Sequence, residues 1–295
     1  MYFSLIIGIK MKSKNKAILY VICSAFCFAL MGTFVKLAGD IPSIQKSFFR
    51  NFVALIVAFI IILHERKKVT IQKRNLPFFF VRSFMGTLGI LCNFYAVDHL
   101  VLSDASILNK LSPFFAILFS YIFLHERLKS FQVFGVFIAF IGAILIIKPT
   151  NSVSAFPAFI GMFGGLSAGA AYTAVRYLGQ HGEKGSVIVL FFSAFSCLVT
   201  LPVLIFDYTP MSAYQVLMLM LAGLSAAGGQ FSITAAYSNA PAREISVYDY
   251  TQVIFSAFMG FFLFSQVPDA LSILGYVIIC GISIVMYKLN LKNKA

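Results

Sequence analysis

Apolar residues run along this chain in long blocks that are separated by short polar segments. A helix needs about 20 apolar residues to cross the hydrocarbon core of a bilayer, which is about 30 Å thick. We predict a transmembrane helix in each of ten segments: 17–38, 43–63, 77–97, 103–124, 131–148, 156–178, 187–206, 214–236, 244–265 and 271–288. The pattern therefore predicts an all-α integral membrane protein. The first run lacks a small-residue cleavage site, so we expect a span rather than a removable signal.

Composition supports this prediction, since 60% of the 295 residues are hydrophobic and only 11% are charged. Soluble domains usually carry about 25% charged residues. The net charge of +13 resides mainly in the tails and alternate loops, whereas five loops contain no Lys or Arg: 39–42, 98–102, 149–155, 207–213 and 266–270. Because positive residues stay on the cytoplasmic side, we expect a multi-pass protein of the bacterial cytoplasmic (inner) membrane with both termini in the cytoplasm. Its basic character then reflects orientation and indicates no nucleic-acid partner.

The sequence His-Glu-Arg occurs twice, at 64–66 and 125–127, each time at the end of an apolar run. A metal site needs three or four converging ligands, which two separated His-Glu pairs with adjacent arginines do not supply. We interpret both motifs as membrane boundaries and expect no metal and no cofactor. The five cysteines all lie inside predicted spans, where a free cysteine acts as a small hydrophobe.

The chain also resembles itself after a shift of 140 residues. "FVKLAG" at 34–39 then faces "AVRYLG" at 174–179, and Gly89 and Gly135 face Gly229 and Gly275. The shift predicts two five-helix repeats, 17–149 and 156–288, with cytoplasmic tails at 1–16 and 289–295. Because five is odd, the second repeat enters the membrane inverted. Inverted repeats recur in secondary transporters, with the substrate site near the bilayer midplane.

The residues of both repeats resemble EamA domains of the drug/metabolite transporter superfamily. In the first repeat the resemblance rests on Tyr95-Ala96, "LSDASIL" at 102–108, Pro113, Glu126, Gly135 and Gly142. In the second repeat it rests on residues 236–268, where Gln266 replaces the span-ending Glu of the family pattern. The resemblance implies ten helices, two inverted repeats and transport of small metabolites.

Charged and polar residues inside the spans identify the candidate site, because a charge at mid-span costs about 2.5–3.5 kcal/mol unless it faces a cavity or a partner. We expect Lys36, Asp104 and Glu244, near span ends, to reach the headgroups. Deeper positions and their polar neighbours give the substrate-binding candidates: Arg50, Arg82, Asn93, Asn109, Lys110, Tyr172, Gln230, Tyr248, Asp249, Tyr250 and Gln252.

Spans four and nine hold the strongest pair of candidates. Lys110 and Asp249 occupy near-equivalent positions in the two repeats, so we expect them to approach one axis and to pair. The pair is either functional or purely structural. Pro113 should also free the backbone carbonyl of Asn109, four residues back. The proton-coupling candidates are Asp249, then Glu244 and Asp104. The small residues of span six, such as Gly161 and Gly165, are expected to serve helix packing.

These features predict a secondary active or facilitative transporter of a small polar metabolite, since the chain has no "GxxxxGK[ST]" phosphate-binding motif. Three deep cations against Asp249 favour an anionic or zwitterionic substrate, such as an amino acid or carboxylated metabolite. We expect no catalytic residues. The expected partners are the small-molecule substrate and membrane lipids, with homodimer and monomer both open. A lipid flippase subunit, an integral-membrane enzyme and a non-transporting sensor are the alternatives. The four histidines do not cluster, which disfavours an enzyme.

Overall fold

The computed structural model describes residues 13–65, 71–124, 130–147, 152–239 and 246–292, and within these ranges the chain forms helices and turns without strands. The first half contains α2 (Ser13–Leu37), α3 (Ser43–Glu65), α4 (Leu76–His99), α5 (Leu102–Asn109), α6 (Ser112–Leu124) and α7 (Ser130–Ile147). The second half contains α8 (Ser152–Gln180), α9 (Gly185–Phe206), α10 (Ala213–Asn239), α12 (Thr251–Phe264) and α13 (Ala270–Lys292). Two short 3₁₀ segments, η1 (Lys73–Asn75) and η2 (Ser246–Tyr250), precede α4 and α12.

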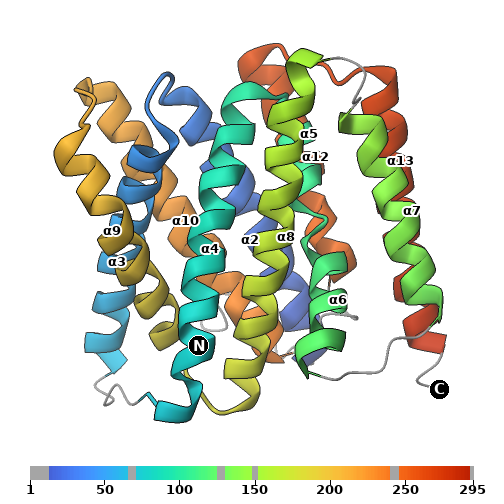
Figure 1. The fold of residues 1–295 in the computed structure, drawn as a ribbon, viewed down its shortest axis with the longest axis horizontal. Helices are drawn as coiled ribbons and strands as arrows, with labels where there is room; N and C mark the ends of the chain where they lie inside the picture. Colours follow the sequence, from blue (N-terminus) through green and yellow to red (C-terminus); the bar gives the residue numbers. More distant parts are fainter. Residues whose placement is uncertain (1–12, 66–70, 125–129, 148–151, 240–245, 293–295) are drawn as a thin grey trace.

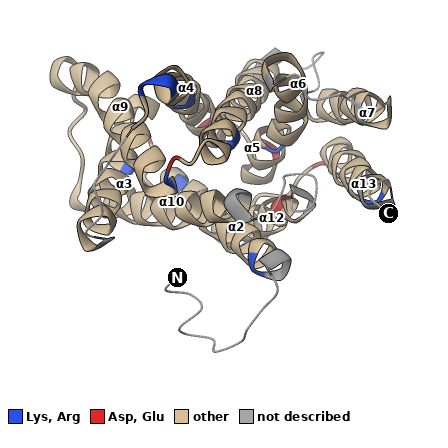
Figure 2. Ribbon diagram, turned by 90° about the horizontal axis from the view of Figure 1, so that it is seen from below, with Lys and Arg blue, Asp and Glu red and all other residues tan. Residues whose placement is uncertain are grey.

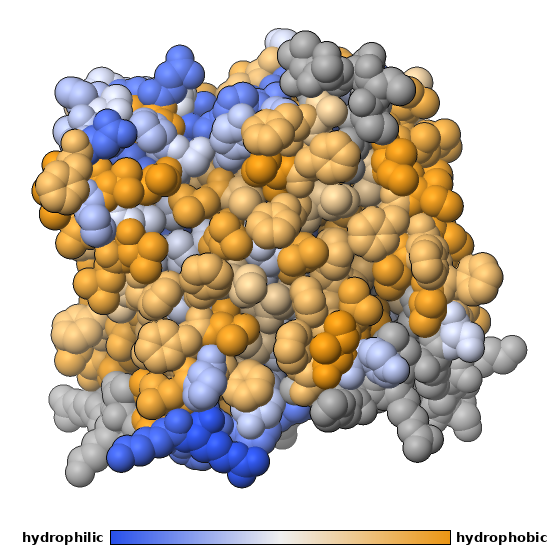
Figure 3. All heavy atoms as spheres, viewed as in Figure 1, coloured by the Kyte–Doolittle hydropathy of each residue, from blue (hydrophilic) through white to orange (hydrophobic). Residues whose placement is uncertain are grey.

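The outer surface is that of a membrane protein. Large apolar side chains such as Phe134, Phe137 and Phe206 are exposed, and a broad apolar band covers the lateral face in Figure 3. Eight helical segments of the described chain are long and apolar enough to span a bilayer, and Val133–Ile146 is a shorter apolar helix. The multi-pass prediction is therefore supported. The count of ten stays a prediction, because the predicted ninth span, 244–265, begins at residues outside the described ranges.

The helices pack in a regular arrangement (Figure 1). α2 packs along α10 and α4 along α8, and these two pairs form the centre. α3 contacts α9 at one edge of the molecule, and α7 contacts α13 at the opposite edge, as the end-on view in Figure 2 shows.

The 140-residue shift found in the sequence also relates helices and contacts. It carries α3 onto α9 and α7 onto α13 within a few residues at each end. Gly135 lies against the Met286 side chain, and the shifted positions, Gly275 and Ile146, lie against each other in the same way. Small residues permit this close approach of two apolar helices.

The predicted span 103–124 is not one helix. α5 ends at Asn109 and α6 begins at Ser112, with Lys110 and Leu111 between them. Pro113 lies in the first turn of α6, where its missing N–H costs little. The backbone carbonyl of Lys110 lies in this break between α5 and α6. It accepts a hydrogen bond of 3.0 Å from the Tyr250 hydroxyl. In the equivalent second-half span, the 3₁₀ turn η2 leads directly into α12.

Polar contacts join the two halves at both ends of the bundle. At one end, the Glu183 carboxylate accepts hydrogen bonds from Asn75 Nδ2 at 2.6 Å and from the backbone N–H of Gln72 at 3.1 Å. At the other end, Gln45 Nε2 donates to the Thr209 carbonyl at 2.8 Å and Thr209 N–H donates back to Gln45 Oε1 at 3.0 Å.

A buried ion pair reinforces this second end. Lys46 Nζ lies 2.6 Å from Asp98 Oδ1, and the Lys46 side chain is fully buried. Lys36, which we expected to reach the headgroups, instead donates to the carbonyls of Val97 and Leu100 at 2.9 and 2.7 Å. An ammonium at this place stabilises the carboxyl-terminal end of α4.

Candidate functional site

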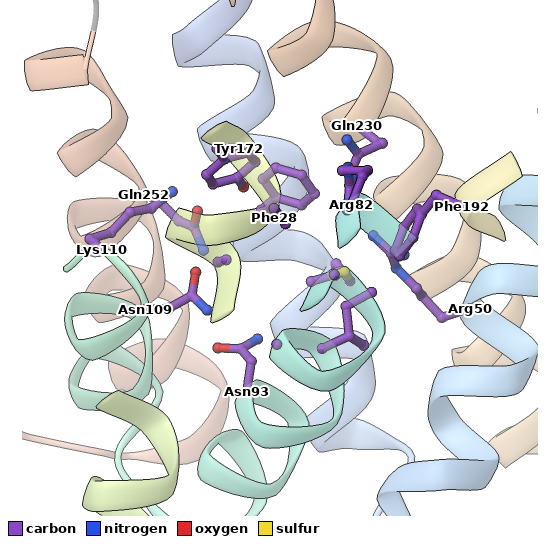
Figure 4. Close-up of a pocket in the computed structure, with 16 residues that line it drawn as sticks. Phe28, Arg50, Arg82, Asn93, Asn109, Lys110, Tyr172, Phe192, Gln230 and Gln252 are labelled. Carbon is purple, nitrogen blue, oxygen red and sulfur yellow. The ribbon is translucent and has the colours of Figure 1, made fainter. Parts of the chain in front are cut away.

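A cavity of about 70 Å³ lies in the interior, where helices of both halves meet. Eight of the eleven predicted substrate-binding residues line it: Arg50, Arg82, Asn93, Asn109, Lys110, Tyr172, Gln230 and Gln252. Figure 4 shows these side chains around one space, with Lys110 and Gln252 at one side and the two arginines at the other. Arg82 and Asn93, both on α4, lie among the residues that line this cavity.

Two arginines share one aromatic ring at the first side of the cavity. The guanidinium carbons of Arg82 and Arg50 lie 4.1 and 5.8 Å from the ring centroid of Phe192. Both arginines are only 3% exposed. Within the described chain neither forms an ion pair with a carboxylate, and the Nε atom of each has no hydrogen-bond partner. Arg50 donates through Nη1 to the side-chain oxygen of Asn51.

Gly86 provides the room in which Arg82 folds back along α4. A Cβ at this position would stand 2.1 Å from Arg82 Nη1 and 2.8 Å from Phe192 Cε2. A glycine one helical turn after the arginine therefore allows the guanidinium to lie against both the helix and the ring.

The opposite side of the cavity holds a buried ion pair. Lys110 Nζ lies 2.9 Å from Asp249 Oδ2, and each side chain is 3% exposed. Lys110 comes from the break between α5 and α6, and Asp249 comes from η2, the 3₁₀ turn that leads directly into α12. The pairing predicted from the sequence is confirmed. Asp249 and Tyr250 both contact Lys110, through its ammonium group and its backbone carbonyl respectively, but neither belongs to the cavity lining.

Amide side chains complete the polar lining. Asn93 and Asn109 enter from the first half, and Gln230 and Gln252 enter from the second. The oxygen Oε1 of Gln252 is buried and has no hydrogen-bond partner. The lining thus presents both donors and acceptors between two charged ends.

Two other predicted residues lie elsewhere. Tyr248 packs its ring against Tyr287, with centroids 6.1 Å apart, and is not part of the lining. Asp104, expected to reach the headgroups, is buried and accepts a hydrogen bond from the Tyr276 hydroxyl. This hydrogen bond joins α5 to α13 inside the protein, so the expectation that Asp104 reaches the headgroups is wrong. Glu244 falls outside the described residues, as does Glu126.

Phe28, Met31 and Phe192 also line the cavity, and the sequence did not single them out. Nothing distinguishes them from the other phenylalanines and methionines of an apolar chain. Phe192 becomes distinctive only in the folded structure, where the guanidinium groups of Arg50 and Arg82 both lie against its ring. Lys46 was likewise missed, because it stands close to a predicted span end.

Charge and size limit what the cavity accommodates. Three cations and one carboxylate leave a formal excess of two positive charges around it. Small-molecule pockets usually measure roughly 300–1,000 Å³, so a cavity of about 70 Å³ admits only part of a metabolite. Across the described residues, no group of three His, Cys, Asp or Glu side chains is placed to hold a metal ion.

Comparison with known proteins places this architecture among transporters. The family model described as the EamA-like transporter family matches residues 15–148. The pseudopaline exporter of Pseudomonas aeruginosa is 33% identical over 269 residues, which cover 90% of this chain and 93% of the exporter. The riboflavin transporter of Brucella anthropi is 24% identical over 280 residues, covering 90% and 95% of the two chains. A solved crystal structure superposes with a TM-score of 0.69 at 15% identity, over 95% of this chain and 99% of the other.

Proposed function

Because this chain belongs to the EamA-like transporter family of the drug/metabolite transporter superfamily, and is therefore a transporter rather than an enzyme, we propose how it works. It moves a small polar metabolite, amino-acid-like, carboxylated or cofactor-like, across the bacterial cytoplasmic membrane by secondary active or facilitative transport. The substrate binds in the central cavity, and alternating access exposes this cavity to each side in turn.

The observation that carries this proposal is a buried polar cavity beside the break between α5 and α6. Transporters commonly place substrate sites at discontinuous helices near the midplane, where two repeats meet. Here the break at Lys110 and the junction of η2 with α12 both stand beside the cavity. Intramembrane charges are costly and mark transport pathways by default.

Two inverted five-helix repeats, 17–149 and 156–288, complete the proposal. α7 and α12 then bring the number of spans to ten. Equivalent helices and glycine contacts related by 140 residues support this division. The side bearing η1 and the α8–α9 connection carries Lys73, Arg74 and Lys184, and the positive-inside rule makes it cytoplasmic.

Names of relatives support a small-molecule substrate. One relative is named a pseudopaline exporter and another a riboflavin transporter. We propose from them only the general class, a small metabolite.

Asp249 is the proposed proton-coupling residue, with Glu244 and Asp104 as further candidates. It is the carboxylate in contact with the lysine of the cavity. Transport that depends on pH in the wild type should lose this dependence in Asp249→Asn. An Asp249→Asn protein with the wild-type rate and pH profile would exclude this role.

The test is a paired metabolite profile of cells expressing the wild type, Lys110→Ala/Asp249→Asn or no transporter, at matched membrane levels. We expect a few compounds to move across the membrane only with the wild type. If the wild type and the double variant give the same profile, and this differs from empty cells, the site is misplaced. If all three profiles agree, the transporter proposal fails for these metabolites, and lipid movement becomes the next assay.

A further inference from the structure

We infer that Arg50 and Arg82 form a carboxylate-binding pole of the cavity, so that the substrate is an organic acid or zwitterion whose carboxylate neutralises them. This inference rests on the proposed function and narrows it to a substrate class. Three features of the structure support it: the uncompensated charge of the two arginines, their geometry, and the contrast between the two sides of the cavity.

The first feature is uncompensated charge. A buried cation usually has a carboxylate partner, because desolvation costs several kcal/mol that only pairing offsets. Lys46 and Lys110 follow this rule, with Asp98 and Asp249 at 2.6 and 2.9 Å. Arg50 and Arg82 are equally buried, yet the described chain offers them no ionic partner. An anion that arrives from outside the protein supplies the missing charge.

The second feature is the geometry of the guanidinium groups. Both approach the Phe192 ring, which gives partial compensation through cation–π attraction and holds the two groups in one region. The unpaired Nε–H groups leave donors available. A guanidinium presents a planar set of donors that matches the two oxygens of a carboxylate.

The third feature is the contrast between the two sides of the cavity. Lys110 is already neutralised by Asp249, whereas the arginine side retains both positive charges. The amides of Asn93 and Asn109 lie between these sides, with Gln252 beside Lys110, and they suit the neutral polar part of a substrate (Figure 4). A strictly cationic compound meets repulsion from Arg50 and Arg82 without a free carboxylate to offset it.

A direct test uses acetate as the probe, since a cavity of about 70 Å³ has room for so small an anion. The thermal unfolding midpoint of the purified full-length protein in detergent is measured with sodium acetate, and with sodium chloride at the same ionic strength. Acetamide serves as the neutral analogue. We expect acetate to raise the midpoint by about 2 °C or more relative to both.

Matched variants assign this shift to the arginine pole. Arg82→Gln should abolish the acetate shift, and Arg82→Lys, which keeps the charge, should retain part of it. Arg74→Gln removes an exposed arginine at the end of the bundle and should leave the shift unchanged. If Arg82→Gln fails to fold, Arg50→Gln gives the same comparison. The inference is overturned if the wild type shows no acetate shift, or if Arg82→Gln (or Arg50→Gln in its place) shows the same shift as the wild type.

Transport gives the second readout and separates the two proposals. Compounds that the wild type moves should carry a carboxylate, and their transport should fall about tenfold or more in Arg82→Gln, as loss of a charge-assisted hydrogen bond predicts. Movement of only neutral or cationic compounds overturns the carboxylate pole while leaving the transporter intact. If acetate raises the unfolding midpoint but no metabolite is transported, the carboxylate-binding pole is supported and the proposed transport function fails.

Discussion

Lys110 and Asp249 illustrate how much one residue pair contributes inside a membrane. Their contact of 2.9 Å is almost completely shielded from solvent. Removing one partner of a buried pair leaves an uncompensated charge, which typically costs about 3–5 kcal/mol. Replacing both partners with apolar residues of similar volume is often nearly neutral.

We therefore expect Asp249→Asn to lower the thermal unfolding midpoint more than Lys110→Met/Asp249→Leu does. Removal of the exposed Lys73 by Lys73→Met should leave the midpoint unchanged. Unfolding of the purified proteins, followed by circular dichroism, gives all three values. A double variant whose midpoint falls as far as that of Asp249→Asn, or further, would contradict this account of the pair.

Gly86 offers a second test at the residue scale. In Gly86→Ala the new methyl group would collide with the Arg82 guanidinium and the Phe192 ring. Because the end of an arginine side chain moves easily, we expect a displaced guanidinium and a reduced acetate response rather than unfolding.

The matched control for this glycine is Gly179→Ala on α8, where a Cβ meets nothing within 4 Å. Alanine is favoured over glycine in helices by about 1 kcal/mol, so this variant should be as stable as the wild type or slightly more stable. An unchanged acetate shift in Gly86→Ala would argue that Gly86 does not position Arg82.

Sequence reasoning reached the charged and amide residues of the site because each is unusual inside an apolar span. Eight of the candidates line the cavity, and Lys110 does pair with Asp249. The same reasoning failed for Phe192, since an aromatic residue facing a cavity has the same sequence signature as one facing lipid. It also misplaced Asp104, whose partner Tyr276 is 172 positions away in the chain.

At the scale of the elements, the small residues of α8 allow it to pack closely against α4 and against α5, the helix that ends at the break beside the cavity. A Cβ on Gly165 would stand 2.6 Å from the backbone oxygen of Leu108 in α5, and one on Gly161 would stand 3.1 Å from Ala96 Cβ in α4. The packing role expected for these residues is confirmed. The break itself was not predicted, because a proline in an apolar run is compatible with a kink as well as with an interruption.

Gly165→Ala should therefore push α5 away from α8, because the new methyl group would meet the backbone of Leu108, which cannot move aside as a flexible side chain can. We expect a loss of about 1–3 kcal/mol, typical of overpacking, together with reduced transport. Gly281→Ala on α13, which meets nothing within 4 Å, is the control. Equal thermal stability of the two variants would contradict the close contact between α5 and α8.

At the scale of the whole molecule, the two proposed repeats differ in what they contribute to the cavity. The 140-residue shift relates the helices, but it replaces the three cations of the lining with uncharged residues: Arg50 corresponds to Leu190, Arg82 to Ala222 and Lys110 to Tyr250. The multi-pass helical scaffold was accessible from the sequence because long apolar runs record it. The shape of the cavity could not be predicted from the sequence, since it depends on how helices from both halves of the chain approach one another.

Polar contacts at the two ends suggest how the cavity is closed. Glu183 joins η1 at one end, and Gln45 joins Thr209 at the other. We expect Glu183→Ala to favour the conformation that opens at the η1 end, because it removes two hydrogen bonds from that end alone. Limited proteolysis of inside-out vesicles should detect greater exposure there, and an unchanged pattern would contradict this role.

The most direct test of the central claim is the accessibility of one cavity residue from both sides of the membrane. Asn93→Cys is placed in a protein whose five native cysteines are replaced, and it is treated with a membrane-impermeant thiol reagent in right-side-out and inside-out vesicles. Alternating access predicts labelling from both sides, with Glu183→Ala increasing it from the η1 side and decreasing it from the other. Labelling from neither side, or from one side only whatever the variant, would contradict a cavity that opens in turn to each face.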